Sequence, residues 1–367
     1  MRRLVLLFLI AASSACTGGD KPRLSLNMLR VPSGFSISLY ADGVPGARSL
    51  ALGPDNVVYV GTRGAGKVYA LPDRNGDHRA DEVIVVAEKL DRPNGIAVHN
   101  GALYVVENHR VLRFDNIGKN FRERPPYRVV YDKLPTEDHH GWRYARFGPD
   151  GKLYIAVGAP CNICEPDPDR YAAIVRLNAD GSGRNVYARG VRNSVGFDWD
   201  PRTKDFWFTD NGRDYLGDDA PPDELNHATA AGLHFGYPYC HGGDLPDPEY
   251  GKKAPCNRFV APVVKIDPHG AVLGMRFYTG AQFPAHYQNG IFIAEHGSWN
   301  RSDPVGYRVL FVPMPNDKPE PVEVFADGWL RDDEVLGRPV DVLVMPDGAL
   351  LVSDDHAGIV YRIVYGK

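Results

Sequence analysis

The chain has 367 residues, with 42 basic and 46 acidic side chains and a formal net charge of −4. The two signs are interspersed without a basic run, which argues against a nucleic-acid-binding protein. Beyond its first residues the chain has no stretch of the ~20 apolar residues that a membrane-spanning helix needs. We therefore expect one large domain with an ordinary solvated surface.

The N-terminus has the pattern of a bacterial export signal. A basic start at residues 1–3 is followed by an apolar run from Leu4 to Ala12 and by small residues that end at Cys16. The run is too short for a lasting transmembrane helix and is typical of a cleaved signal. A cysteine directly after small residues resembles a lipobox, which predicts a signal over residues 1–16 with lipidated Cys16, and a tether over residues 17–32. The chain is then expected in the periplasm or at the cell surface, held to the membrane only through Cys16, or secreted if Cys16 is not lipidated.

Polar turns between short apolar runs recur along the rest of the chain. Their spacing is roughly 40–50 residues, except between residues 151 and 290, where two repeats and an insertion are expected. The turns are Asp55-Asn56, Asn100-Gly101, Asp150-Gly151, Asn289-Gly290 and Asp347-Gly348, and Phe197–Thr209 supplies a further repeat. A hairpin repeated at this spacing is typical of a propeller blade. Residues 33–367 are therefore predicted to form an all-β, six-bladed β-propeller.

The segment Phe35–Tyr40 alternates like a strand but has no partner within its own repeat. We expect it to pair with the last blade and close the ring, which removes an exposed sheet edge. This architecture places functional residues on the loops at one end of a central channel.

Four cysteines remain after Cys16, an even number that suits an oxidising compartment. Three connectivities are possible. The local choice, Cys161–Cys164 with Cys240–Cys256, would staple two loops beside the candidate site. A redox-active pair at Cys161 and Cys164 is the alternative, but no thioredoxin-like βαβ context surrounds it.

Two polar clusters stand immediately before predicted inner strands. His139 and His140, beside Asp138, could provide a base with an orienting partner or metal ligands. The alternative is a surface histidine pair. Arg192 and Asn193 offer a fixed cation and an amide to a polarised carbonyl or an anion, unless the arginine only braces the ring.

The later loops add further polar groups. The acidic loop 210–226 is rich in carboxylates and turns, which suits the oxygen ligands of Ca²⁺. Arg301 follows the inner strand of the fifth repeat, and Arg338 and Asp341 open the sixth. Because these residues come from equivalent ends of several blades, we expect them to converge on one site.

A second calcium-type pattern lies nearer the N-terminus. Asp73, Asn75, Asp77 and Asp81 fall at positions one, three, five and nine of an EF-hand-like loop. Histidine and isoleucine occupy the positions where that pattern has glycine and glutamate. The loop is either a short Ca²⁺ site or an acidic solvent loop, and no catalytic role is attached to it.

Together these motifs resemble the pyrroloquinoline-quinone (PQQ) dependent glucose/sorbosone dehydrogenases, which are secreted bacterial six-bladed propellers. The resemblance covers nearly the whole chain after the signal and is most specific at His140–Asp150, Gly190–Asn193, Asp223–Asn226 and Phe235–Pro238. The His-His-Gly-Trp-Arg wording that starts at His139 is closer to the sorbosone branch than to the glucose branch.

The resemblance implies roles for individual residues. His140 would be the base that takes the proton of the substrate hydroxyl, and Arg192 would contact the quinone carbonyl that receives hydride. The residues implied to bind PQQ are Asn94, Arg192, Asn193, Arg301 and Arg338. Those implied near a Ca²⁺ that polarises PQQ are Gly212, Asp214 and Asp219. Tyr237, Trp142 and Trp299 are candidate sugar-stacking walls or, equally, blade packing.

The resulting hypothesis is a PQQ- and Ca²⁺-dependent oxidoreductase that oxidises an aldose or aldehyde sugar and passes electrons to a cytochrome or a quinone. Two features depart from the family pattern: His139 replaces the acid expected beside the base, and a pair of arginines in the sixth blade is reduced to Arg338 beside Asp341. One rival hypothesis is a non-catalytic cell-surface binding propeller. Another is a metal-dependent sugar lactonase, which Arg92–Gly95 also resembles, although no glutamate stands between residues 43 and 55 as its first ligand.

Overall fold

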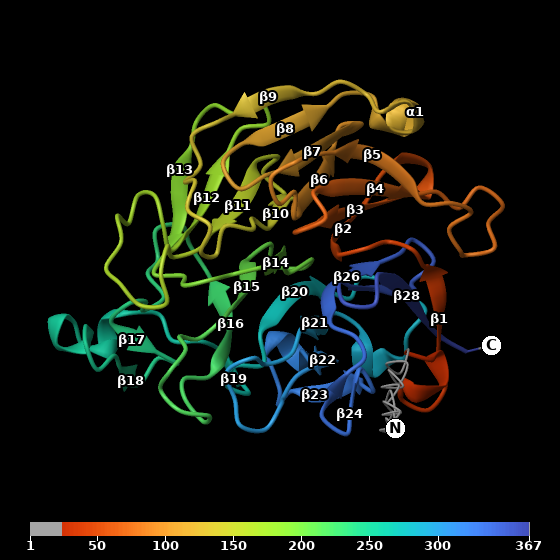
Figure 1. Ribbon diagram of the computed structural model, residues 1–367. Helices are drawn as coiled ribbons and strands as arrows, with labels where there is room; N and C mark the ends of the chain where they lie inside the picture. The colour runs from red at the N-terminus through yellow and green to blue at the C-terminus, as the bar shows by residue number, and fades with distance from the viewer. Residues whose placement is uncertain (1–23, 367) are drawn as a thin grey trace, which may run out of the picture.

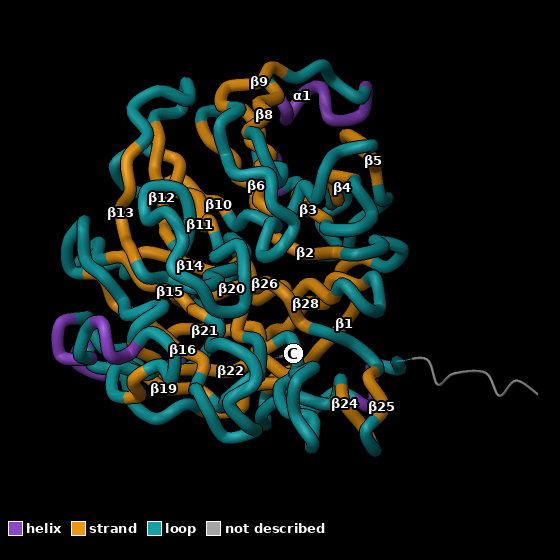
Figure 2. Tube along the Cα trace, turned by 60° about the vertical axis from the view of Figure 1, so that its left-hand side comes forward, coloured by secondary structure: helices purple, strands orange, loops and turns teal. Residues whose placement is uncertain are grey.

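The computed structural model describes residues 24–366, which form a ring of six four-stranded antiparallel sheets around a central axis (Figure 1). Figure 2 shows the same chain from another side, with strands and the loops that join them making up most of it. This arrangement confirms the predicted all-β, six-bladed propeller. The predicted export signal and Cys16 lie outside the described residues.

The first three blades follow chain order from the axis outward. Blade I contains β2 (Ala47–Leu52), β3 (Val58–Thr62), β4 (Lys67–Leu71) and β5 (Ile84–Glu88). Blade II contains β6 (Gly95–His99), β7 (Ala102–Val106), β8 (Val111–Phe114) and β9 (Arg128–Tyr131). Blade III contains β10 (Ala145–Phe147), β11 (Leu153–Val157), β12 (Ala173–Leu177) and β13 (Asn185–Arg189).

The remaining blades carry the insertion and the ring closure. Blade IV contains β14 (Gly196–Trp199), β15 (Phe206–Asp210), β16 (Asp223–Ala228) and β19 (Val264–Ile266). Its insertion holds the short pair β17 (Cys240–His241) and β18 (Leu245–Pro246). Blade V contains β20 (Val272–Phe277), β21 (Ile291–Glu295), β22 (Arg308–Val312) and β23 (Glu323–Ala326), followed by the pair β24 (Leu330–Arg331) and β25 (Glu334–Val335). Blade VI contains β26 (Pro339–Val344), β27 (Leu350–Asp354), β28 (Ile359–Tyr365) and β1 (Phe35–Ala41).

Helical structure is sparse in residues 24–366. It consists of the single turn α1 (Ile117–Asn120) and of short 3-10 segments at Leu26–Met28, Pro54–Asn56, Phe121–Glu123, Gly251–Lys253, Cys256–Arg258, Ala285–Tyr287 and Pro315–Asp317. None of these helices is long and apolar enough to cross a membrane.

Strand β1 closes the ring, as predicted. It pairs antiparallel with β28, with Phe35 opposite Tyr365, so the outer strand of blade VI comes from the start of the chain (Figure 1). The preceding residues also pack on the propeller: Leu29 is 7% exposed, and the Arg30 guanidinium binds the Asp327 carboxylate at 2.6 Å. Residues 24–32, which were expected to be part of a tether, therefore lie against the ring.

The predicted turns form because their residues tolerate left-handed backbone. Between β6 and β7, His99 pairs with Ala102, so Asn100 and Gly101 alone make the turn. Their φ angles of 48° and 74° are both positive, as a type I′ hairpin turn requires. Asn-Gly is the usual pair at such a turn, which is why this motif located the hairpins in the sequence.

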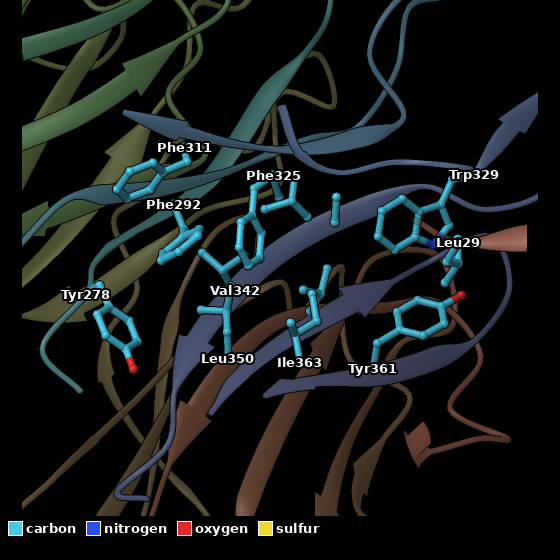
Figure 3. Packing of buried hydrophobic residues seen from close by; sticks show 14 of the residues in the cluster. Leu29, Tyr278, Phe292, Phe311, Phe325, Trp329, Val342, Leu350, Tyr361 and Ile363 are labelled. Atoms are coloured by element: carbon cyan, nitrogen blue, oxygen red, sulfur yellow. The ribbon is translucent and has the colours of Figure 1, made fainter. Parts of the chain in front are cut away.

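Aromatic side chains fill the space between blades V and VI (Figure 3). The rings of Phe292 and Phe325 lie 4.6 Å apart at 67°, in the edge-to-face manner that aromatic quadrupoles favour. Val342 and Leu350 of blade VI belong to the same cluster and have no exposed surface. Burying one such side chain contributes roughly 1.5–3 kcal/mol, so this interface holds the last two blades together.

A buried ion pair joins four blades at the axis. The Arg276 guanidinium of β20 lies 3.5 Å from the Asp341 carboxylate of β26, and both side chains are at most 5% exposed. Arg276 also donates to the Tyr144 hydroxyl, which precedes β10. The Leu50 N–H of β2 donates to the same Asp341 oxygen at 2.9 Å. These contacts link inner strands that are far apart in the sequence.

Candidate active site

A cavity of about 720 Å³ opens at one end of the channel. Nearly all of its wall residues lie where the inner strand of a blade begins or where the second strand ends, and Asp223 begins a third strand at the same end. Because these two strands are antiparallel, such positions all meet at one end of the propeller. The lining residues are Arg48, Arg63, Asp138, His139, His140, Trp142, Arg192, Asn193, Asn211, Gly212, Asp214, Asp223, His269, Ala271, Leu273, His296, Gly297, Trp299 and Arg338.

His140 is a buried, neutral imidazole in the wall of this cavity. It is 8% exposed, and its Nδ1 lies 2.9 Å from the Ala159 carbonyl oxygen, so Nδ1 carries the proton. Burial, followed by the positive charge of Arg192, lowers the pKa of His140 well below 6.5. The other ring nitrogen, Nε2, therefore keeps its lone pair and can accept a proton.

The backbone at Gly158 lies very close to the His140 side chain. A Cβ on Gly158 would lie 2.5 Å from the His140 Cβ, so only glycine fits on that strand end. Arg143, which is 1% exposed, donates to the His140 carbonyl at 3.1 Å and to the Pro135 carbonyl at 2.9 Å. The imidazole is thus fixed through its own backbone.

Arg192 is held by almost all of its guanidinium donors. Nε donates to the Asn162 carbonyl at 2.9 Å, and Nη2 donates to the Asn162 side-chain oxygen at 2.8 Å. Nη1 reaches the Asn211 carbonyl at 3.2 Å, and Nη2 also reaches the Asp214 carboxylate at 3.4 Å. Since a guanidinium has five N–H donors, one N–H of Nη1 is left for a ligand in the cavity.

The main chain of Arg192 and Asn193 is fixed by a buried carboxylate. The two Asp210 oxygens accept the Arg192 N–H at 2.7 Å and the Asn193 N–H at 2.6 Å. Burial and the nearby Glu224 raise the pKa of Asp210 well above 3.8, against the effect of these N–H groups. Asp210 therefore orients the two residues from behind the cavity wall.

Two disulfides are present, and they follow the local connectivity: Cys161–Cys164 and Cys240–Cys256. The first encloses Asn162, the residue that holds Arg192. The Cys164 N–H donates to the Tyr237 hydroxyl oxygen at 3.1 Å. The loop thus acts as a staple, and it presents Asn162 to the site.

We expect Asn162→Ala to lower the free energy of unfolding by about 2 kcal/mol, because a buried guanidinium loses a side-chain acceptor and a hydrogen bond to a charged group contributes about 1.5–3 kcal/mol. Urea denaturation measures the change. Asn178→Ala, in an exposed turn, is the matched control. A loss no greater than that of the control would contradict the assigned role of Asn162.

A histidine–carboxylate pair lies on another part of the wall. His296 Nε2 is 2.9 Å from one Asp355 oxygen, and Arg48 donates to the other at 2.5 Å. Burial lowers the pKa of His296. Burial alone would raise the pKa of Asp355, but His296 and Arg48 outweigh it and lower that pKa, which keeps Asp355 anionic. Arg338 lies 3.5 Å from His296 Nδ1 and completes a cationic wall.

His269 brings an unpaired acceptor to the cavity. Its Nε2 lies 2.9 Å from the Gly217 carbonyl and 3.1 Å from the Ala220 carbonyl, so Nε2 is the donor. Nδ1 is buried without a hydrogen-bond partner among residues 24–366. An unpaired buried acceptor is costly, and a ligand with an O–H or N–H group would satisfy it.

The structure brings together six of the predicted site residues, which all line the cavity: His140, Arg192, Asn193, Gly212, Asp214 and Arg338. Asn94 lies behind the wall with no exposed surface, where it accepts from Arg48 at 2.6 Å and donates to the Arg143 carbonyl at 2.7 Å. Its place is therefore to position Arg48 and Arg143.

Two other predicted residues do not line the cavity. Arg301 donates to the Asp218 carbonyl at 2.6 Å, so its guanidinium holds a neighbouring loop. The Asp219 side chain is 97% exposed and lies 3.8 Å from Arg301. Both residues lie beyond the cavity rim.

Sequence reasoning missed Arg48, Arg63, His269 and the pair His296 with Asp355. Arg48 stands at the start of an inner strand, just as Arg192 and Arg338 stand before theirs, and this shared position was a usable signal. His269 has no comparable signal, because only the fold of the loop that carries Gly217 and Ala220 makes it a cavity residue.

The second calcium-type loop is closed by its own hydrogen bonds. The Asp73 carboxylate accepts the Gly76 and His78 N–H groups at 2.9 and 3.0 Å, and Asp81 accepts the Arg74 N–H at 2.8 Å. Among residues 24–366, no group of three or more histidine, cysteine or acidic side chains is placed to hold a metal ion.

Comparison with known proteins agrees with this picture. An uncharacterized protein of Borreliella burgdorferi is 32% identical over 92% of this chain and 91% of its own length. A pyrroloquinoline quinone-dependent pyranose dehydrogenase of Coprinopsis cinerea is 22% identical over 82% of this chain, which spans only 46% of that protein.

Solved structures share the fold at low sequence identity. The PQQ domain of the Coprinopsis cinerea pyranose dehydrogenase, in its holo form, superposes with a TM-score of 0.78 at 21% identity, covering 95% of this chain and 99% of that one. A PQQ-bound aldose sugar dehydrogenase of Streptomyces coelicolor gives 0.67 at 18% identity, covering 91% and 99%. The sequence profile described as glucose/sorbosone dehydrogenase matches residues 107–362. The chain therefore belongs to the glucose/sorbosone dehydrogenase family.

Proposed function

We propose that this protein is a PQQ-dependent oxidoreductase that oxidises an aldose or an aldehyde sugar. The observation that carries the proposal is the buried neutral His140 in the wall of an arginine-rich cavity. Family membership favours this function over a sugar lactonase and over a non-catalytic binding propeller. We further propose that the chain belongs to the sorbosone branch of the family and not to the glucose branch.

The residues present fit PQQ, which is a planar tricarboxylate with a quinone. Four arginines line the cavity: Arg48, Arg63, Arg192 and Arg338. Guanidinium groups suit carboxylates because of their planar donor geometry. Arg48 and Arg192 each have a carboxylate partner, Asp355 and Asp214. Arg338 donates to the neutral Gly297 carbonyl, and Arg63 stacks on the Trp142 ring, so both keep an uncompensated positive charge for a ligand carboxylate. On the cavity wall as the structure describes it, His269 Nδ1 offers an unpaired buried acceptor.

The chain's own residues would carry the proton chemistry. When bound, PQQ would supply the two-electron acceptor that the protein side chains lack. His140 Nε2 would take the proton from the sugar hydroxyl, because Nδ1 is already committed to Ala159. The remaining Arg192 N–H would stabilise negative charge that develops on an oxygen in the cavity. Asn162 and Asp210 keep that donor in place.

Calcium is a further part of the proposal. Gly212 and Asp214 of the acidic loop lie on the cavity wall, and their main-chain oxygens are the candidate ligands. Such oxygens suit Ca²⁺, which would polarise a neighbouring quinone oxygen as a Lewis acid. The exposed Asp219 side chain is left out of this set.

The proposed setting of the enzyme follows from its sequence. An export signal with lipidated Cys16 would place the protein in the periplasm or at the cell surface, with the lipid as its only membrane attachment. A cytochrome or a quinone would serve as electron acceptor there. Radiolabelled palmitate incorporation in cells, compared between wild type and Cys16→Ser, tests the anchor.

Reconstitution tests the function. We expect the purified protein to bind PQQ in an absorbance titration and then to reduce a redox dye with aldoses or sorbosone as donor. EDTA should remove most activity and Ca²⁺ should restore it. Absence of PQQ binding would overturn the proposal. Activity that EDTA does not change would contradict the proposed role of Ca²⁺.

A further inference from the structure

Two exposed aromatic rings stand at the rim of the cavity. Tyr215 is 68% exposed and Trp299 is 67% exposed, and their ring centroids lie 5.9 Å apart at 89°. They come from two different loops, one after β15 and one after β21. Large aromatic side chains gathered in the open mark a binding surface more often than isolated ones do.

The two loops that carry this pair are clamped together. Arg301 donates to the Asp218 carbonyl at 2.6 Å and to the Pro268 carbonyl at 3.4 Å. The Ser302 N–H donates to both Asp218 carboxylate oxygens at 3.2 Å. The rings therefore sit on a braced support, which lowers the entropy that binding would cost.

The pair continues the cavity wall outward. Trp299 itself lines the cavity, and Gly212 and Asp214 on the Tyr215 loop line it too. The other aromatic candidates are less exposed than this pair. The Arg63 guanidinium lies 3.8 Å over the Trp142 ring, and Tyr237 is 3% exposed beneath the Cys161–Cys164 loop.

We infer that Tyr215 and Trp299 form a second sugar subsite, which binds the second ring of a disaccharide or a longer oligosaccharide whose reducing end enters the cavity. This inference rests on the proposed function. The apolar C–H face of a pyranose packs on an aromatic ring, while its hydroxyls stay in water at the rim. The two rings contact each other edge to face, so each holds the other in place and the sugar packs on the ring surface that is left exposed. The substrate class is therefore an oligosaccharide with a free reducing end.

Steady-state kinetics with a matched pair of sugars tests the subsite. The pair is an aldohexose and its 1,4-linked disaccharide. The quantity compared is the KM of the disaccharide divided by the KM of the hexose. We expect this ratio to rise about tenfold in Trp299→Ala and about fivefold in Tyr215→Ala, as the loss of one aromatic contact implies. Trp299→Phe, which keeps an aromatic ring, should leave the KM ratio close to that of the wild type. Tyr127→Ala, at an exposed tyrosine outside the cavity lining, is the control.

A binding experiment separates this inference from the proposed function. The disaccharide is titrated into the protein without added cofactor, and tryptophan fluorescence is followed. Saturable binding that Tyr215→Ala weakens would support the subsite even if the protein oxidised no sugar. An unchanged KM ratio with unchanged disaccharide binding would overturn it. The inference would also be overturned if the variants reduced a cytochrome more slowly while the KM of every sugar stayed unchanged. Tyr215 and Trp299 would then be assigned to docking of the electron acceptor.

Discussion

His140→Ala is expected to lower kcat by about 10²–10⁴-fold, the usual contribution of a positioned general base. The imidazole is buried, oriented by Ala159 and neutral, so its removal leaves the cavity without the group that takes the hydroxyl proton. The binding of PQQ should survive, because the arginines on the wall remain. Dye-reduction kinetics together with a PQQ titration measure the two effects separately. Equal loss of binding and turnover would contradict a role as base.

The acid limb of the kcat/KM profile is expected to lie below pH 6.5. A base acts in its neutral form, and burial lowers the pKa of His140 well below 6.5, so protonation abolishes activity only as the pH falls through that lowered pKa. His139→Ala is the control for this profile. Burial and the charge of Arg192 also lower the pKa of His139, but we assign it no proton transfer. The charge of His139 also contributes to the lowered pKa of His140, so His139→Ala should keep the acid limb and move it towards higher pH. Loss of the limb in this variant would reverse the assignment.

Arg276→Met is expected to cost about 3–5 kcal/mol of folding free energy, because it leaves the Asp341 carboxylate buried without its cation. The pair lies at the axis, where Tyr144 and Leu50 also bind to it. Urea denaturation of the purified protein measures the loss.

Two variants make this stability prediction specific. The double variant Arg276→Met with Asp341→Leu should recover part of the loss, since replacing both charges of a buried pair by apolar groups is often nearly neutral. Arg331→Met, at a side chain that is 64% exposed, should change stability by less than about 0.5 kcal/mol. A single variant as mild as this control would contradict the assigned role of the Arg276–Asp341 pair.

The fold could be predicted from local signals because each blade repeats one. Asn100-Gly101 and Asp150-Gly151 located hairpins through their turn chemistry, and the unpaired alternation of Phe35–Tyr40 indicated the strand that closes the ring. The register of that strand on β28 depends on a contact between the two ends of the chain. No local pattern encodes it.

The site was only partly predictable, and the misses have a physical reason. Arg192 and Arg338 stand directly before inner strands, so their sequence position already fixes the end of the channel at which they lie. Arg301 stands several residues beyond the end of β21, and the path of its loop decides where its guanidinium goes. It goes to Asp218 instead of the cavity. His269 enters the site for the converse reason, through a loop packed on the acidic segment.

Ring closure also bears on when the protein can fold. Blade VI needs β1, which the ribosome makes first, and β26, β27 and β28, which it makes last. Five blades can pair their strands as they emerge, but the sixth stays incomplete until the final residues are available, and long-range pairing of this kind is slow. A chain shortened at its C-terminus would leave β1 with no sheet to join and blade V with one face open to water. The ring can therefore close only when β26, β27 and β28 have all been made. Folding of the propeller is completed after synthesis of the chain.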